Sequence, residues 1–568
     1  MTVLASRKRA AGAAPSALDT LRPVTTPELI ELQLRPAGLL PRALAFMLDF
    51  GLRTGVLLFA STALNAMEGF GQGIALLLWF VLEWFYPVLF EVLGKGATPG
   101  KRALGLKVLH DDGTPVAWGP SLTRNLLRAA DFLPFLYLFG AISCLLHSEF
   151  RRLGDIVAGT VVVYAEKNSG LPRIPEVEPI APSAALDRAT QRALIGFAER
   201  ANTLTEARRE ELAELMPHLG NASGMQSANR STRPRQLPDR ASHMKQEQFE
   251  ALHATDWQLF EDWLADRQRS SKSRGEPPFP LHEAALRYRR ICQQLALARD
   301  RDYALATLDR LHNLARRGHD ELYGARRSFG RRTWNYVTAG FAIDVRAQWR
   351  WVLASFLLLF GPMLIAFVVV QIWPDVAYFV MSPHDVAGME AMYSDANQHL
   401  GRTRDAGTDF GMFGHYIFNN ISIAFRCFAG GMTAGILTVF SLLFNGLYIG
   451  IAHSRVVLAG FGDNFHSFVV GHGAFELGAI VLAGATGMQL GAAILAPGLL
   501  SRASALRTTA RRLIGTVCGM AVMLVIAALL EAFWSPLRLP LPWKLGFGFS
   551  MLSVVLTYFI FAGRRRGS

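Results

Sequence analysis

The chain alternates long apolar runs with short basic segments. Two runs lie near the N-terminus, LPRALAFMLDFGLRTGVLLFASTAL and GIALLLWFVLEWFYPVLFEVL, and a larger group extends from residue 351 to residue 562. These runs approach or exceed the roughly 20 residues of helix that cross a hydrocarbon core of about 30 Å. The pattern predicts an all-α, polytopic α-helical integral membrane protein with two membrane modules.

The first module, residues 36–165, is predicted to begin with a helical hairpin. Arg42, Asp49 and Arg53 interrupt its first run at spacings of seven and four residues, which place them on one helical face. Charged side chains within a span face protein or water rather than lipid. We expect Asp49 to pair internally with Arg42 or Arg53, as a structural ion pair. The alternative is a substrate or ion site that Asp155 completes.

The segment after the second run is basic, so both ends of the hairpin are predicted to be cytoplasmic. GLKVLHDDGTPVAW places an Asp-Gly pair between two β-prone runs, and GTVVVY at 159–164 offers a third strand. A small cytoplasmic β hairpin or sheet is expected here. The apolar stretch 132–147 has arginines at both ends, which favours a re-entrant hairpin over a full crossing.

Three further segments are expected to be cytoplasmic. Residues 1–35 are interpreted as a disordered tail, and residues 166–243, rich in Pro, Ser and Arg, as a linker with one amphipathic helix. Residues 244–349 are predicted to form a soluble helical segment. Its helices are MKQEQFEALHATDWQLFEDWL, HEAALRYRRICQQLALARD and ALATLDRLHNLARRGHDELY, which show helical periodicity and polar connections.

The second membrane module, residues 350–568, is predicted to cross about six times. After the span at 351–373, the loop 375–411 has six acidic residues and only Arg402 and Arg404, as an external loop should. The remaining apolar stretches lie at about 413–431, 434–453, 466–494, 513–533 and 545–562. With six crossings, the arginine-rich ends fall on the cytoplasmic side. If 413–431 lay in the interface instead, that charge pattern would fail.

Composition supports this class. Hydrophobic residues make up 51% of the 568 residues and charged residues 18%, a balance that is rare in soluble proteins of this size. The net charge of +13 comes mainly from segments that flank the apolar runs, and no nucleic-acid motif accompanies it. The four cysteines are widely spaced, which argues against a disulfide framework or a zinc site.

The second module carries the candidate polar site. His472 and Glu476 are four residues apart on one expected helix, where they could hold a proton, bind a cation or tie two helices together. A polar clasp is the alternative without chemistry, and Asn445 and Asn420 fit that role better still. Glu531 lies at the end of another span and could converge with Glu476. The second histidine of a zinc-protease helix is missing, and we assign no catalytic residue, metal or cofactor.

Three motifs in the first module resemble the RDD family of membrane proteins. They are RALAFMLD with Arg42 and Asp49, TPGKRALGLKV at 98–108, and RRLGDIVAGTVVV with Asp155. They occur in order over about 130 residues. The resemblance implies a transporter or an accessory membrane module.

From Met244 to the C-terminus, the chain resembles the stage II sporulation protein M family. The motifs are FNNI with Asn420, FNGLYIG with Asn445, GHGAFELGAIVLAGATGMQLG with His472 and Glu476, PGLLSRASALR, and LEAFWSP with Glu531. The resemblance implies a membrane protein without enzymatic activity, and sporulation members of the family act as scaffolds that localise peptidoglycan-remodelling proteins. The preceding RDD-like module is a departure, because the two units usually occur separately.

Two functions follow as hypotheses. The first is a non-enzymatic scaffold or accessory protein of the bacterial cytoplasmic membrane, whose partners are the lipid bilayer and other membrane or envelope proteins, with no nucleic acid; a homo-oligomer is compatible with this reading. The second is a transporter or an ion or proton pathway that uses the charged residues inside the spans. A lipid-modifying enzyme ranks below both, because no reaction geometry is apparent.

Overall fold

The computed structural model describes residues 22–25, 31–133, 137–165, 246–268, 278–280, 283–301, 303–323, 333–394 and 406–564. The chain divides into two compact units. The membrane unit contains Met1–Val24, Glu31–Ala165 and Gly324–Ser568, and the helical unit contains Glu166–Tyr323 with the short segment Thr25–Ile30. The expected linker helix within 166–243 lies outside the described residues.

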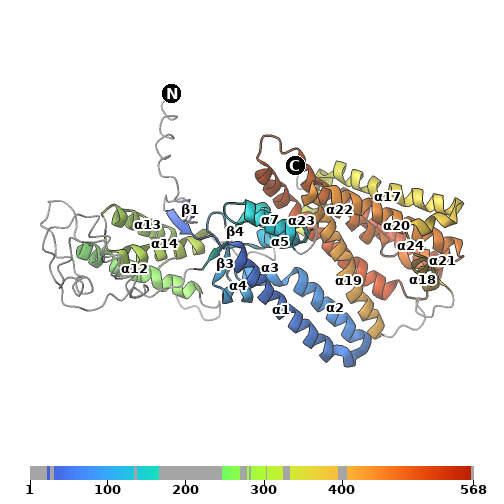
Figure 1. The fold of residues 1–568 in the computed structure, drawn as a ribbon, viewed down its shortest axis with the longest axis horizontal. Coiled ribbons are helices and arrows are strands. Elements are labelled where there is room, and N and C mark those ends of the chain that lie inside the picture. The colour runs from blue at the N-terminus through green and yellow to red at the C-terminus, as the bar shows by residue number, and fades with distance from the viewer. Residues whose placement is uncertain are drawn as a thin grey trace. The chain divides into compact units, whose positions relative to one another are not determined.

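The first membrane module begins with the expected helical hairpin (Figure 1). Its two long helices are antiparallel, since Arg53 of the first contacts Glu83 of the second, and Leu64 of the first contacts Gly71 of the second. The second helix ends at Trp84, and a separate helix begins at Tyr86 with Pro87 in its first turn. Elements of this module are β1 (Arg22–Thr25), β2 (Glu31–Leu34), α1 (Leu39–Leu64), η2 (Asn65–Met67), α2 (Glu68–Trp84), α3 (Tyr86–Leu93), α4 (Pro99–Ala103), β3 (Leu106–His110), α5 (Trp118–Leu126), α6 (Arg128–Asp131), α7 (Leu138–Leu146), α8 (Leu153–Ala158) and β4 (Thr160–Tyr164).

The strands differ in part from the prediction. β3 pairs with β4 in antiparallel register, from Leu106 opposite Tyr164 to His110 opposite Thr160. The run after the Asp-Gly turn forms only a single bridge, at Pro115, instead of a strand. Within the stretch 1–35, which was expected to be a disordered tail, the described residues 22–25 and 31–34 form β1 and β2, which pair with each other. Val24 and Leu34 pack against the β3–β4 sheet, and this apolar contact orders them.

The stretch 132–147 does not form a full-length spanning helix. Its helix α7 has 9 residues, which at 1.5 Å per residue reach roughly 14 Å, about half of the hydrocarbon core. The α7 residue Gly140 faces Asp131 of α6, so the chain folds back between these two helices. This geometry agrees with the expected re-entrant hairpin.

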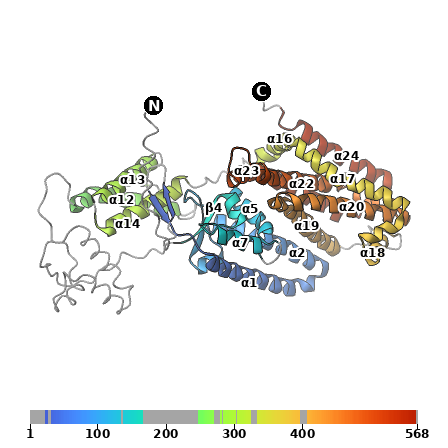
Figure 2. The same cartoon turned by 45° about the horizontal axis from the view of Figure 1, so that its top comes forward.

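The second membrane module is a bundle of long helices (Figures 1 and 2). By length and composition, six helical segments of the described chain could cross a membrane: Leu39–Trp84, Trp349–Ile372, Ile436–Leu458, Gly473–Leu495, Arg502–Trp534 and Leu541–Phe561. The elements of this module are η7 (Tyr336–Gly340), α16 (Phe341–Ala347), α17 (Trp349–Ile372), η8 (Pro374–Phe379), α18 (Pro383–Tyr393), α19 (Ala406–Ala429), η9 (Gly430–Thr433), α20 (Ile436–Leu458), α21 (Gly462–Val469), α22 (Gly473–Leu495), α23 (Arg502–Leu529), η10 (Leu530–Trp534) and α24 (Leu541–Phe561).

Helix α19 is not among the six apolar candidates, because it contains polar residues. The directions of its neighbours α17 and α20 nevertheless identify it as a crossing. A Cβ on Gly446 of α20 would lie 2.2 Å from the Leu359 carbonyl oxygen of α17, and one on Gly450 would lie 2.3 Å from that of Met363, so the two helices run parallel. Parallel spans require the intervening chain to return across the membrane. α19 has 24 residues, about 36 Å of helix, which is enough for this return.

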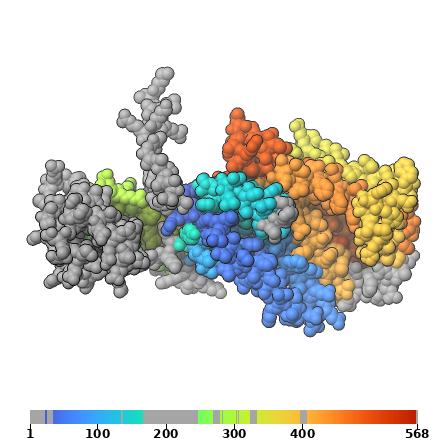
Figure 3. Space-filling model, in the orientation of Figure 1, coloured from blue at the N-terminus to red at the C-terminus, as the bar shows by residue number. Residues whose placement is uncertain are grey.

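Helix α19 also joins the two membrane modules. It runs parallel to α2, since Phe70 stacks on Phe410 at 4.4 Å between ring centroids and Trp79 packs on Phe418 at 4.5 Å. Figures 1 and 2 show the two helices side by side, and the blue residues of α1 and α2 border orange residues of the second module in Figure 3.

Glycines permit this approach of α2 and α19. A Cβ on Gly73 would lie 2.4 Å from the carbonyl oxygen of Phe410, and one on Gly414 would lie 2.6 Å from the carbonyl oxygen of Gly73. Small residues at four-residue spacing are typical of membrane helices whose backbones touch. At the far end of the contact, the Trp84 indole donates to the Ser422 hydroxyl at 3.0 Å. The two modules therefore form one packed unit.

The two modules share one hydrophobic core. Buried residues of the first module, such as Leu127 and Val157, belong to the same apolar cluster as Phe428 of α19 and Leu513 of α23. Outside the apolar region, the Arg507 guanidinium lies 2.7 Å from a carboxylate oxygen of Asp111 in the β3 turn. The segment 336–347, which the sequence attached to the soluble helices, packs instead against α23 and α24.

The helical unit contains the three predicted helices, α12 (Gln246–Gln268), α13 (Ala284–Asp300) and α14 (Leu305–Tyr323). Phe249, Trp257, Phe260 and Leu264 form the buried stripe that their spacing indicated. Leu252 does not join it and is 63% exposed. The core is completed by α13 and α14 residues, so this unit buries its apolar surface without help from the membrane unit.

The membrane topology can be tested by cysteine labelling. In a background without the native cysteines, we expect His384→Cys on α18 to react with a membrane-impermeant maleimide in intact cells. Thr255→Cys on α12 should react only after permeabilisation, because arginine-rich segments stay cytoplasmic. Both positions are exposed. Labelling of Thr255→Cys from outside intact cells would contradict this orientation.

The α2–α19 contact predicts a clear difference between two glycine substitutions. Gly73→Leu should destabilise the protein by about 1–3 kcal/mol, because the new side chain overlaps the α19 backbone. Gly55→Leu is the matched control, since Gly55 of α1 has open space around it. Thermal unfolding in detergent, followed by size-exclusion chromatography, measures both. Equal melting temperatures for the two variants would refute the contact.

Candidate functional site

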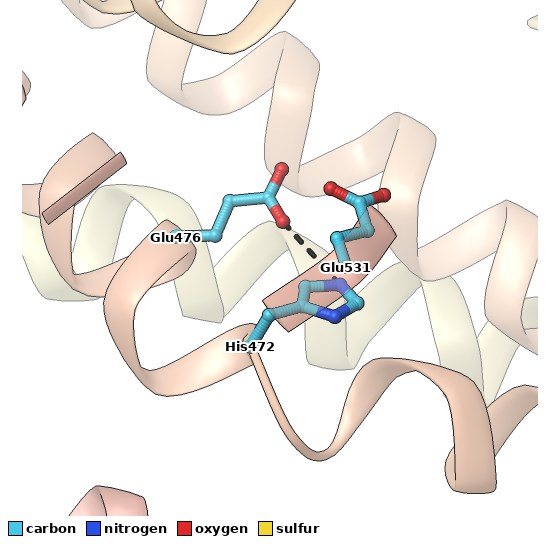
Figure 4. Close-up of side chains that lie close together, drawn as sticks. All are labelled: His472, Glu476 and Glu531. Carbon is cyan, nitrogen blue, oxygen red and sulfur yellow. Dashed lines mark ion pairs between the residues drawn. The ribbon is translucent and has the colours of Figure 1, made fainter. Parts of the chain in front are cut away.

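The predicted polar residues of the second module converge where α22 begins and α23 ends. His472 directly precedes α22, Glu476 lies in its first turn, and Glu531 lies in η10, a π-helical turn that continues α23. An α-helix rarely widens into a π turn, and such turns are frequent at functional sites. Figure 4 shows the three side chains directed toward one another from the two segments.

The distances within this cluster are short. The His472 Nε2 atom lies 3.5 Å from Glu476 Oε2, and the Asn420 side-chain amide donates to Glu476 Oε1 at 2.9 Å. One ligand atom each of His472, Glu476 and Glu531 lies within 4.8 Å of the others. The structure brings Asn420 and Glu531 close to Glu476. We call His472, Glu476, Glu531 and Asn420 the polar cluster.

Neighbouring groups fix the orientation of His472. Its Nδ1 atom lies 3.0 Å from the hydroxyl of Ser535, and the ammonium of Lys544 on α24 donates to the Ser535 carbonyl at 2.7 Å. The imidazole is 3% exposed, so it cannot exchange this partner freely for solvent. Nε2 is thereby aimed at Glu476. The sequence motif LEAFWSP contained Ser535, but nothing in its pattern indicated this role, and Lys544 was not identified.

Asn445 does not belong to the polar cluster. Its amide donates to the carbonyl oxygen of Ser441 on its own helix at 2.7 Å. The glycines of α22 serve packing: a Cβ on Gly487 would meet the Cys427 carbonyl at 2.7 Å, and one on Gly491 would meet the Gly435 nitrogen at 2.5 Å. Thus α22 holds the cluster at one end and close helix contacts along the rest of its length.

The polar cluster can do three things chemically. One carboxyl can retain a proton, because two ionised carboxylates close together in a low-dielectric setting are costly. The imidazole nitrogen and the carboxylate oxygens can ligate a divalent cation. The Asn420 hydrogen bond ties α19 to α22 in either case.

In the first module, Asp49 is not ion-paired with Arg42 or Arg53 as expected. Its carboxylate accepts hydrogen bonds from the Tyr86 hydroxyl at 2.8 Å, the Thr98 hydroxyl at 2.5 Å and the Gly100 nitrogen at 2.8 Å. Neutral donors on α3 and α4 take the place of the arginine because α4 packs directly on α1. A Cβ on Gly100 would lie 2.9 Å from the Asp49 carboxyl carbon.

The two arginines of α1 bind other acids. Arg42 forms an ion pair with Asp155 of α8. The Arg53 guanidinium nitrogen Nη1 lies 3.2 Å from the carboxylate oxygen Oε2 of Glu83 on α2. The side chains of Arg42 and Arg53 share a helical face, as the spacing indicated, but their partners come from elements far along the chain. The sequence could not identify those partners, since it does not show how α8 folds back on α1.

Asp155 is the centre of a buried charge network. Besides the ion pair with Arg42, its carboxylate oxygen Oδ1 lies 2.8 Å from Arg124 Nη2 and 3.4 Å from Arg152 Nε. The side chain of Asp155 is fully buried. Burial by itself raises the pKa of Asp155, but the surrounding arginines, Arg124 first, hold it well below the usual range. Nearby, burial raises the pKa of Asp131 to about 6, although Arg152 opposes the shift.

Glu91 extends this network, and sequence analysis assigned it no role. Its carboxylate accepts from Lys101 at 2.7 Å, Ser121 at 2.8 Å and Arg124 at 3.1 Å. Burial raises the pKa of Glu91, but the charges of Arg124 and Lys101 outweigh this effect and lower it to about 2. Burial likewise lowers the pKa of Lys101, to about 8, against the attraction of Glu91. In the sequence, the motif TPGKR, which contains Lys101, could have indicated this charge network.

An apolar cavity of about 660 Å³ lies between α1 and α2. Arg53 and Glu83 form part of its wall, with Phe50, Leu57 and Trp79. This cavity is separate from the polar cluster, whose residues do not line it.

The fold and the apolar helices define a multi-pass α-helical membrane protein. Residues 36–159 match the RDD family and residues 354–536 match Stage II sporulation protein M. The chain is a fusion of these two domains, as its motifs indicated. No curated protein and no solved structure is similar to the chain.

The helical unit matches a third family. Residues 247–324 match a domain of unknown function (DUF8413), and the Stage II sporulation protein M match begins at residue 354 rather than at Met244. These limits agree with the structure, in which the helices up to Tyr323 have their own core and the membrane unit resumes at Gly324.

The buried network predicts a large effect for Glu91→Gln. This change leaves Lys101 and Arg124 without their shared carboxylate, and breaking a buried pair in this way costs about 3–5 kcal/mol. Glu68→Gln, the same change at an exposed position of α2, should cost at most about 0.5 kcal/mol. Because the pKa of Glu91 is lowered to about 2, its stabilisation should be complete at neutral pH and lost as the pH falls from about 5 toward 2. Denaturation of both variants across this pH range measures the effect, and a Glu91→Gln variant that matches wild type at pH 7 would contradict it.

Proposed function

We propose that this protein is a non-enzymatic scaffold of the bacterial cytoplasmic membrane that organises membrane or envelope proteins. One observation carries the proposal most directly. The RDD and Stage II sporulation protein M domains pack through α2 and α19 into one unit with a shared core. A shared core means that the two domains keep a fixed geometry, and a platform for other proteins needs this property.

The helical unit supplies a second argument. It buries its own apolar core and still exposes leucines, with Leu252 63% and Leu286 54% exposed. Exposed leucines on a charged helical domain offer apolar surface that a partner can bury. We propose that this unit recruits partners on the cytoplasmic side while the membrane unit anchors the assembly.

Affinity purification of the full chain from native membranes, with mass spectrometry, tests the scaffold. Wild type should enrich a reproducible set of envelope proteins. The double variant Leu252→Glu, Leu286→Glu should lower the affinity for at least one of them about tenfold, equivalent to roughly 1.4 kcal/mol. Thr255→Glu, which adds one charge at an exposed polar position of α12, is the control. No enrichment above an unrelated membrane protein, or equal loss in the control, would contradict the proposal.

A second candidate, a cation or proton pathway, is favoured by the polar cluster. Carboxylates among membrane helices mark ion pathways in many proteins. Reconstitution in liposomes with a pH-sensitive or cation-sensitive dye separates the two functions. In a pathway, Glu476→Gln should abolish flux and Asn445→Ala, outside the cluster, should retain it. In a scaffold, wild-type liposomes show no flux above empty liposomes, and Glu476→Gln keeps its partners.

A further inference from the structure

The geometry points to a divalent transition-metal site in the polar cluster, with His472, Glu476 and Glu531 as ligands. The site would join the beginning of α22 to the end of α23. It would act as a fixed structural cation, and the inference does not depend on the scaffold proposal.

Donor chemistry and spacing support a cation of the zinc type. One imidazole nitrogen and two carboxylate oxygens are ligands that Zn²⁺ and its neighbours accept. Around a tetrahedral zinc ion with bonds of about 2.0–2.1 Å, two ligand atoms lie about 3.4 Å apart. His472 Nε2 and Glu476 Oε2 are already 3.5 Å apart. The three ligand atoms lie within 4.8 Å of one another, which is close to that spacing.

The surrounding groups are those that a metal site needs. A ligating histidine usually engages its other ring nitrogen in a hydrogen bond, which fixes the ring and its tautomer. His472 does so with Ser535, whose carbonyl is in turn held by Lys544. Asn419 donates to Asn420 at 2.9 Å, and Asn420 donates to Glu476, so a chain of amides orients that carboxylate as well.

Charge balance gives an independent reason. His472 is 3% exposed, the Glu531 Oε2 atom is shielded from solvent and the Glu476 side chain is 23% exposed, so the cluster gathers two carboxylates that are partly withdrawn from water. A divalent cation neutralises both and provides ligand bonds at the same time. Protons could neutralise the carboxylates instead. Titration with metal separates the two alternatives, because only a metal site binds one Zn²⁺ per chain.

Titration of the tag-free full chain in nanodiscs tests the site. After removal of metal with a chelator, isothermal calorimetry with ZnCl₂ should show one Zn²⁺ per chain, and Co²⁺ should give the visible absorption of a nitrogen- and oxygen-ligated ion. Glu531→Gln and His472→Ala should each weaken Zn²⁺ binding at least about tenfold, the lower limit seen even for groups that only support a ligand. Zn²⁺ should also raise the melting temperature of wild type.

A pair of histidines elsewhere in the membrane unit provides the control. His453 and His466 lie 2.9 Å apart through their Nε2 atoms and are not part of the cluster. His453→Ala should keep wild-type affinity. If His472→Ala does not fold, Glu531→Asp tests the same geometry, because it keeps the charge and withdraws the carboxylate; it too should weaken binding. Absence of stoichiometric Zn²⁺ binding, unchanged affinity in Glu531→Asp, or loss of binding in His453→Ala alone would overturn the inference.

Discussion

The close backbone contact of α2 with α19 is the constraint on which the membrane unit depends. Lipid gives membrane helices little hydrophobic reason to associate, so van der Waals packing at small residues has to hold them together. Gly73 and Gly414 let the two backbones meet, and aromatic pairs such as Trp79 with Phe418 fill the space on either side. Because α19 also contacts α22 and α23, this helix pair links the RDD domain to the second bundle, together with the contacts of α5 and α8 with α23.

The same geometry determines where polar groups can be buried. α19 runs parallel to α22, so Asn420 reaches Glu476 and Gly431 packs on Gly487. A carboxylate in such a bundle is tolerated only where other helices bring it polar partners. The first module solves the same problem differently: Asp155 and Glu91 are buried among arginines and a lysine, outside the spans. At Asp155 and Glu91 charge thus compensates charge, whereas the polar cluster relies on amides, an imidazole and the metal ion that we infer.

These features bear on function together. A membrane unit with one core and a helical unit with its own core suit a protein that positions partners, whereas the polar cluster is a feature that a moving ion or proton could use. A structural metal reconciles the cluster with a scaffold, since it would strengthen the junction of α22 and α23 without a transport cycle. In the flux and metal-binding experiments, a scaffold, a pathway and a structural cation give different results.

The sequence by itself determined the class of protein, both membrane domains and the helices of the soluble unit, because those depend on local periodicity and on the length of apolar runs. It also indicated that His472 and Glu476 lie close together, although His472 directly precedes α22 instead of lying within it. Tertiary structure decided the partners. Asp49 was expected to bind an arginine of its own helix and instead binds Tyr86, Thr98 and Gly100, while Arg42 binds Asp155, more than a hundred residues away. The physical reason is that an ion pair between segments depends on how helices fold back on one another, and neither hydropathy nor spacing carries that information.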